Sequence, residues 1–166
     1  KILNLIKGES GKKIFSKSHV LFRNKNKLVL REINQINYKK FIIEKSVNNI
    51  SFENGASLSF SEVSKIEKNN LNIITVDRDK LIFPLVLRNF NHGDYFFPYG
   101  MNGSKKVGKF LKDNNIVELD KSSKPILVNG DDKIIWIVGM RLDDRFSVKN
   151  DSKSLLNIEY NKKTSV

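Results

Sequence analysis

The sequence has no cysteine, which excludes disulfide bonds and thiolate metal sites and is the usage expected in a reducing cytoplasm. No apolar run approaches the roughly 18 residues that a membrane-spanning helix needs, and no signal peptide is recognisable at the start. We therefore expect a cytoplasmic protein without membrane contact. The first residue is Lys1 and not methionine, which suggests a piece of a longer protein.

Catalytic and cofactor motifs are also missing. Neither a phosphate-binding loop of the form G-x-x-x-x-G-K-[ST] nor a dinucleotide motif G-x-G-x-x-G occurs. The two histidines, His19 and His92, are far apart in the sequence and have no metal-ligand spacing. The acids Asp131-Asp132 are typical of a hairpin turn, and Asp143-Asp144 between two arginines indicate a local ion-pair network. We predict no catalytic residue, no metal site and no cofactor in this chain.

What is abundant is positive charge. The 166 residues carry 30 lysines and arginines against 18 acidic residues, a net charge of +12. Such an excess favours a polyanionic partner. Lysine outnumbers arginine 24 to 6, a bias that AT-rich coding also produces, so that charge alone leaves the partner open. Residues 1–46 hold 12 basic and 3 acidic side chains, and the end of this excess predicts two domains, 1–46 and 47–166.

Alternating apolar residues separated by short turns predict a β-rich chain. Two hairpins are expected, one joining 20–23 to 28–30 and one joining 126–128 to 134–138. Further strands are expected at 41–43, 58–60, 73–76, 85–87 and 156–160, whereas residues 61–68 fit either a helix or a strand.

One helix is predicted, over about 104–114. Ser104 is a candidate N-cap, and Val107, Phe110 and Leu111 recur at helical spacing as its buried face. A single helix among many strands indicates a β-rich α+β fold.

A glycine-rich segment precedes this helix and contains the strongest candidate site. Gly100-x-x-Gly103 is followed by Ser104, Lys105 and Lys106, so that two cations are expected in the first helical turn, where the helix dipole disfavours them. A phosphate held by backbone amides and by these lysines would supply the missing negative charge. An ordinary loop that caps a helix is the alternative.

Arginine is rare in this chain, so that arginines near this loop suggest planar recognition of phosphate, with structural salt bridges to Asp94 or Asp143 as an equal alternative. We expect Gly93 and Asp94 to form a structural turn. The neighbouring aromatic residues either stack on bases or pack in the core. The candidate phosphate contacts are Arg88, Gly100, Gly103, Ser104, Lys105, Lys106, Lys109, Arg141 and Arg145.

The order of these residues resembles the C-terminal domain of bacterial tRNA(Ile)-lysidine synthetases. The resemblance is carried by Leu87-Arg88, Gly93-Asp94, the segment 98–106 with its two glycines, Phe110 and Asp113, and it continues through 125–128 and 135–146. Upstream, residues 11–23 resemble the closing β segment of that family's middle domain. The resemblance therefore covers residues 11–149.

The resemblance implies a layered β-sandwich that is shared with a domain of the phenylalanyl-tRNA synthetase β subunit. It also implies that the full-length protein is a ligase, which uses ATP with Mg to adenylate the wobble cytidine of a minor isoleucine tRNA, so that lysine can attack and form lysidine. In that family the ATP chemistry belongs to an N-terminal domain with an S-G-G-x-D-S loop, which this sequence lacks. The chain would contact that domain, bind the acceptor stem of tRNA and be inactive alone.

The sequence departs from this family at several positions. Many members carry basic residues where Asn89 and Tyr95 stand here, and Glu118-Leu119-Asp120 replace a Pro and Arg that often follow the helix. Two other functions therefore stay open. One is a structural or dimerisation module that forms a homodimer through the apolar runs 81–83 and 134–138, and the other is a generic RNA-binding module that uses Gly100-x-x-Gly103.

Overall fold

The computed structural model describes residues 2, 5, 13–16, 19–24, 27–32, 40–52, 55–66, 70–116 and 124–161. Internal contacts divide the chain into two compact units, residues 1–36 and residues 37–166. The second unit begins before the expected boundary at 46/47, because β4 (Phe41–Ile43) pairs with β8 (Leu85–Asn89). No helix in the described part of the chain is long and apolar enough to cross a membrane.

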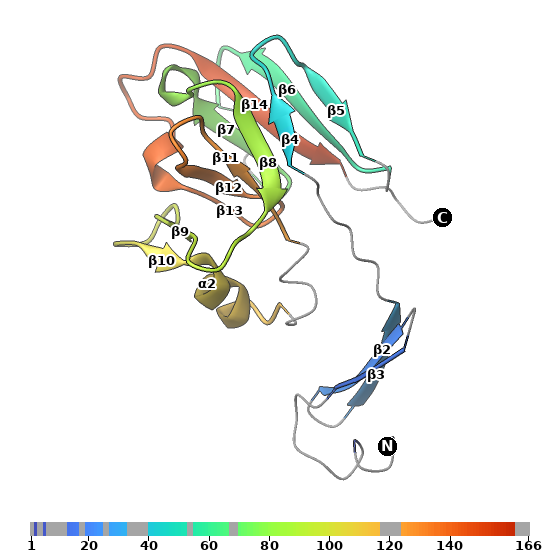
Figure 1. Ribbon diagram of the computed structural model, residues 1–166. Coiled ribbons are helices and arrows are strands. Elements are labelled where there is room, and N and C mark those ends of the chain that lie inside the picture. The colour runs from blue at the N-terminus through green and yellow to red at the C-terminus, as the bar shows by residue number, and fades with distance from the viewer. Residues whose placement is uncertain are drawn as a thin grey trace. The chain divides into compact units, whose positions relative to one another are not determined.

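The first unit contains a three-stranded antiparallel sheet in the order β1-β2-β3 (Figure 1). These strands are β1 (Lys13–Phe15), β2 (His19–Asn24) and β3 (Lys27–Glu32). The predicted hairpin is confirmed, since Leu21 pairs with Leu30 and Asn24 pairs with Lys27. The two residues of its turn, 25 and 26, lie outside the described residues, as does Gly11-Lys12.

The second unit contains two larger antiparallel sheets. A four-stranded sheet has the strand order β5-β6-β14-β7, and a five-stranded sheet has the order β13-β12-β11-β8-β4. A two-stranded ribbon is formed by β9 and β10. The remaining strand bounds are β5 (Asn49–Ser51), β6 (Ser57–Val63), β7 (Ile73–Asp77), β9 (Tyr95–Phe96), β10 (Lys105–Lys106), β11 (Pro125–Val128), β12 (Ile134–Ile137), β13 (Arg141–Leu142) and β14 (Leu155–Asn161).

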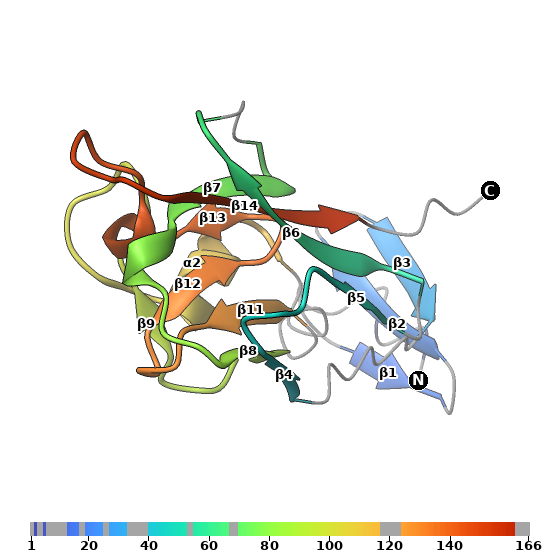
Figure 2. The ribbon, with the colours of Figure 1, turned by 90° about the horizontal axis from the view of Figure 1, so that it is seen from above.

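These elements form three layers, and the five-stranded sheet is the middle one (Figure 1). In the view from above, the strands of the four-stranded sheet lie nearer to the viewer than the middle sheet (Figure 2). Every residue of β11 and β12 is buried. Leu127 and Trp136 belong to the core shared with the four-stranded sheet, whereas Ile126 and Ile137 pack with Phe96 and the helix on the other face. The predicted layered, β-rich fold with one main helix is confirmed.

The hairpin of β11 and β12 contains a bulge at Ile135. Leu127 lies opposite Trp136 and Val128 lies opposite Ile134, so that Ile135 is the extra residue. Ile135 and Trp136 consecutively enter the core shared with the four-stranded sheet. The carbonyl of Ile135 accepts a hydrogen bond from the amide N–H of Asp143 (2.8 Å), which ties the middle sheet to the segment that carries the site.

The other strands predicted from alternation are confirmed within a residue or two of their bounds, except that β6 continues three residues beyond the predicted 58–60. In the undecided segment 61–68, residues 61–63 belong to β6, and residues 67 and 68 lie outside the described residues. The strands β5, β9, β10 and β13 were not predicted, because two or three residues are too few for an alternating pattern.

The helix is shorter than predicted, because α2 spans Val107–Asp113. Lys105 and Lys106 lie in β10, opposite Phe96 and Tyr95, so that the prediction of two lysines in the first helical turn is wrong. Lys106 occupies the N-cap position and no side chain caps the helix, so that Ser104 is not the N-cap. Pairing with β9 supplies the backbone hydrogen bonds of residues 105–106 and outweighs the local capping signal. The buried face of the helix is as predicted.

Asp77 links the end of β7 to the turn that precedes β14. Its side chain is nearly buried, accepts hydrogen bonds from Ser152 Oγ (2.7 Å) and the Asp79 amide N–H (3.2 Å), and lies 3.4 Å from Lys80 Nζ. Burial by itself would raise the pKa of Asp77, but the hydrogen bonds and the lysine outweigh it and lower the pKa below the ordinary 3.8. The carboxylate is therefore more stable in the folded than in the unfolded chain.

We expect Asp77 to make folding sensitive to acid. Because its folded-state pKa is lowered, the stabilisation is present above the unfolded-state pKa and is lost as the pH falls through the folded-state value. The free energy of unfolding, measured with urea between about pH 5 and pH 2, should fall less steeply in Asp77→Asn than in the wild type. Equal steepness in the two proteins would exclude this role.

Candidate nucleic-acid interface

The glycine-rich loop 97–104 connects β9 to β10 and is fixed at its beginning. The amide N–H of Tyr99 donates to the Leu142 carbonyl (2.9 Å), and the amide N–H of Asp144 donates to the Phe97 carbonyl (2.7 Å). Gly100 and Gly103 adopt positive φ angles of 77° and 80°, with nothing near the position of a Cβ. The loop therefore begins on the middle sheet and turns back through an exposed glycine tip.

Asp143 fixes this loop from the inside. Its side chain is fully buried and accepts from the Phe97 amide (2.9 Å), the Arg145 amide (2.9 Å) and the Arg145 guanidinium at both oxygens (2.9 and 2.7 Å). The hydrogen bond and charge of Asp143 raise the pKa of Arg145 above its ordinary value, against the effect of burial. The Arg145 guanidinium also lies over the Phe97 ring at 4.7 Å. Arg145 is thus committed to an internal pair.

Arg88 is committed in the same way. Its guanidinium donates to both carboxylate oxygens of Asp94, at 2.8 and 3.0 Å, and only 22% of the Arg88 side chain is exposed. Gly93 turns the chain with a φ of 100°, and the carbonyl of Asp94 accepts from the Val107 amide (2.8 Å). This pair joins the end of β8 to the starts of β9 and α2, and it leaves little of the Arg88 charge for an external anion.

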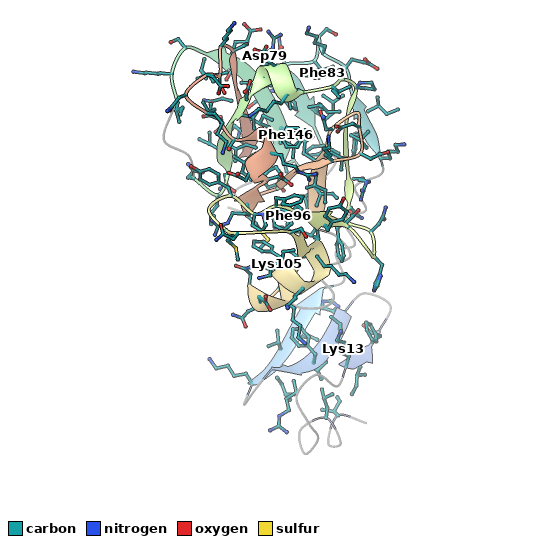
Figure 3. All side chains as sticks on the ribbon, turned by 90° about the vertical axis from the view of Figure 1, so that its left-hand side faces the viewer. Lys13, Asp79, Phe83, Phe96, Lys105 and Phe146 are labelled. Carbon is teal, nitrogen blue, oxygen red and sulfur yellow. The ribbon has the colours of Figure 1, made fainter. Side chains whose placement is uncertain are left out.

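Lys105 lies close to α2, below Phe96 in the view of Figure 3. Its ammonium group lies 2.8 Å from Asp113 and 5.8 Å from the centre of the Phe110 ring, and 21% of its side chain is exposed. The hydrogen bond from Lys105 lowers the pKa of Asp113, with further contributions from the charges of Lys105 and Lys109. The ion pair of Lys105 therefore joins β10 to the last residue of α2.

Three of the candidate cations are exposed: Lys106 at the end of β10, Lys109 in α2 and Arg141 in β13. None of them has a carboxylate within salt-bridge distance among the described residues. Arg141 reaches only the Tyr99 carbonyl, at 3.4 Å, which is longer than an ordinary hydrogen bond. We call Lys106, Lys109 and Arg141 the free cations. The structure thus separates the six predicted cations into three that form internal ion pairs, Arg88, Lys105 and Arg145, and three that are exposed.

The aromatic residues beside the loop differ in burial. Phe96 is fully buried in the core, whereas Tyr95 and Tyr99 are 55% and 48% exposed. Tyr95, Ser104, Lys106 and Lys109 line a surface depression of about 610 Å³, together with Gly93 and Lys105. Among the residues that the structure describes, no acidic side chain lines it. Within the described ranges, no group of three or more histidine, aspartate or glutamate side chains is placed to hold a metal ion.

The comparisons with known proteins first define the class. The TilS substrate binding domain family matches residues 1–33, and the TilS substrate C-terminal domain family matches residues 85–159. A structure described as "Crystal structure of TILS C-terminal domain" superposes with a TM-score of 0.64, covering 76% of this chain and all of that chain. At 22% sequence identity this likeness shows the fold alone. The chain is therefore of the class of TilS C-terminal domains.

Curated relatives give the family. The tRNA(Ile)-lysidine synthase of Parabacteroides distasonis is 33% identical over 159 residues, which are 92% of this chain and 35% of that protein. The tRNA(Ile)-lysidine synthase of Caldanaerobacter subterraneus is 35% identical over 86 residues, which are 52% of this chain and 18% of that protein. This chain belongs to the tRNA(Ile)-lysidine synthase family, and it spans about a third of the length of the first of these relatives.

Sequence reasoning missed the part that Asp143 plays in the loop. The sequence predicted an ion pair between Asp143 and a neighbouring arginine, and the pair with Arg145 is confirmed. The hydrogen bond to the Phe97 amide, 46 positions away, could not be predicted because it depends on the bridge between Pro98 and Asp143. The available signal was the proximity of Asp143 to a rare arginine.

Proposed function

We propose that this chain is the tRNA-binding part of a tRNA(Ile)-lysidine synthetase and that it engages the acceptor stem. In the full-length protein, ATP-dependent ligation of lysine to the wobble cytidine of a minor isoleucine tRNA would occur in an N-terminal domain that binds ATP and Mg. This chain would contribute substrate binding in the cytoplasm and no catalytic residue. The proposal is supported by the family and by one observation, the three free cations around an anchored glycine loop.

The division between paired and free cations supports specific parts for each. Internal pairs hold Arg88, Lys105 and Arg145, so that these residues shape the loop. The free cations retain their charge for phosphates, as Lys and Arg do in most protein contacts with nucleic-acid backbones. Gly100 and Gly103 have no side chain and nothing within 4 Å of the position of a Cβ, so that at these two positions an RNA backbone can approach the loop closely. Such contacts position an RNA without reading its sequence.

The rival proposal is a dimerisation module. Of its two apolar runs, residues 134–138 are fully buried in the middle sheet and are not available to a partner. The run 81–83 keeps one strongly exposed member, Ile82, at 51%. A homodimer through this surface would not need the free cations.

Sedimentation velocity at moderate salt separates the two proposals. We expect the 166-residue chain to sediment faster when folded tRNA is added and to show no concentration-dependent self-association without it. Self-association that tRNA leaves unchanged, together with no comigration of tRNA and protein, would support the dimerisation module instead.

A further inference from the structure

The depression beside the free lysines contains an aromatic ring and an ammonium group on one face of the β9–β10 ribbon. Lys106 lies directly opposite Tyr95 in the register of the two strands, and both are exposed. Directly opposed residues of an antiparallel pair point to the same face, with Cβ atoms about 4.5–5.5 Å apart. The other pair of the ribbon, Lys105 and Phe96, therefore points to the opposite face, toward α2 and the core.

The ring of Tyr95 is supported from below by other side chains. Phe97, two residues further along the chain, meets it edge to face with ring centres 6.3 Å apart. The Arg145 guanidinium lies 4.7 Å from the centre of the Phe97 ring and is itself held by the buried Asp143. More than half of the Tyr95 side chain is nevertheless exposed. A supported and exposed aromatic ring is a surface on which another flat ring can stack at low entropic cost.

The chemistry of the depression selects the ligand. Its lining residues include the aromatic Tyr95, the cationic Lys106 and Lys109, the hydroxyl-bearing Ser104, and Gly93, beside which there is open space. Lys105 also lines it, with its charge compensated by Asp113. A ligand with a planar ring for Tyr95 and a negative charge for the lysines would complement these residues, and a nucleotide has both properties. Inside a duplex each base pair is covered on both faces by its neighbours, so that an unpaired nucleotide, unlike an internal base pair, can present its face to Tyr95.

We propose that this depression binds an unpaired nucleotide of RNA, with the base stacked on Tyr95 and its phosphate at Lys106 and Lys109. This inference rests on the proposed tRNA-binding function and adds to it a class of ligand, single-stranded RNA, at a defined place. Stacking on an aromatic side chain tolerates any base, so that the site favours unpaired over paired RNA without reading sequence.

The test compares Tyr95→Ala with Tyr95→Phe in the 166-residue chain, using two probes. One is a short single-stranded RNA with an internal 2-aminopurine, and the other is a blunt RNA duplex. We expect Tyr95→Ala to weaken binding of the single strand about tenfold and to leave binding of the duplex unchanged. Tyr95→Phe should bind both probes like the wild type. Stacking should quench the 2-aminopurine fluorescence with the wild type and with Tyr95→Phe, but not with Tyr95→Ala.

Failure of this inference is distinguishable from failure of the proposed function. If Tyr95→Ala binds both RNAs as the wild type does, or loses affinity equally for both, the nucleotide site is overturned. The double variant Lys106→Ala and Lys109→Ala should still weaken binding of both probes, so that the wider RNA-binding role survives such a result. If the wild type binds neither RNA, both proposals fail. Because Tyr95 is exposed, an unchanged melting temperature should show that Tyr95→Ala is folded.

Discussion

Replacing Asp143 with alanine is expected to lower the free energy of unfolding by about 3–5 kcal/mol, as measured by urea denaturation. The substitution removes a fully buried carboxylate and leaves the partly buried Arg145 guanidinium without its partner. It also leaves the Phe97 amide without the acceptor that fixes the start of the loop. Breaking a buried pair by removing one partner costs more than the pair itself contributes, because the remaining charge stays desolvated.

Two further variants sharpen this prediction. Asp143→Asn keeps an oxygen for the Phe97 amide but loses the charge that pairs with Arg145, so that its cost should lie below that of alanine. Asp151→Ala is the matched control, because Asp151 is an exposed aspartate in a turn of the same unit, and it should change stability by less than about 0.5 kcal/mol. A cost below about 1 kcal/mol for Asp143→Ala would contradict the structural role given to this residue.

The fold was predictable where strands are long enough to alternate. The hairpin formed by 125–128 and 134–137 was evident from two apolar runs around a polar turn, in which Asp132 adopts a positive φ of 63°. The bulge at Ile135 was not, since a continuous apolar run gives no sign of which residue is extra. The extent of α2 was also missed, because capping signals are local whereas the pairing of Lys105 with Phe96 is tertiary.

The site was predictable in its composition but not in how its charges are used. The sequence indicated the glycine loop, the arginines and the lysines, and it left open whether the arginines bind phosphate or form salt bridges. The pairing of Arg88 with Asp94 depends on a turn at Gly93, and that of Lys105 with Asp113 depends on the length of α2. Only the folded geometry therefore distinguishes a cation that is used internally from one that is left for a ligand.

Removing the free cations is expected to weaken tRNA binding on the order of a hundredfold or more. In the triple variant Lys106→Ala, Lys109→Ala and Arg141→Ala, each substitution deletes a charge-assisted contact of about 1.5–3 kcal/mol where that contact is made. The free cations have no internal carboxylate partner among the described residues, so that the melting temperature should stay near that of the wild type. Affinity is measured by fluorescence anisotropy with labelled tRNA.

The control for this variant removes the same charge elsewhere in the second unit. Lys45, Lys65 and Lys153 are exposed lysines away from the loop. Their triple alanine variant has the same net charge as the free-cation variant, because each removes three unit positive charges. We expect it to lose only the small, long-range part of the affinity. Equal losses of tRNA affinity in the two variants would mean that the affinity depends on the net charge of the protein and not on the position of the free cations.

The dependence of tRNA affinity on salt is the most direct test that the free cations, which lie on β10, α2 and β13, contact the phosphate backbone. For each phosphate that a cation neutralises, the slope of log K against log salt changes by about 0.9 in a duplex region. The free-cation variant should therefore have a slope shallower than that of the wild type by roughly 2.7, whereas the Lys45, Lys65 and Lys153 variant should run parallel to the wild type. Parallel lines for the wild type and the free-cation variant would contradict the account.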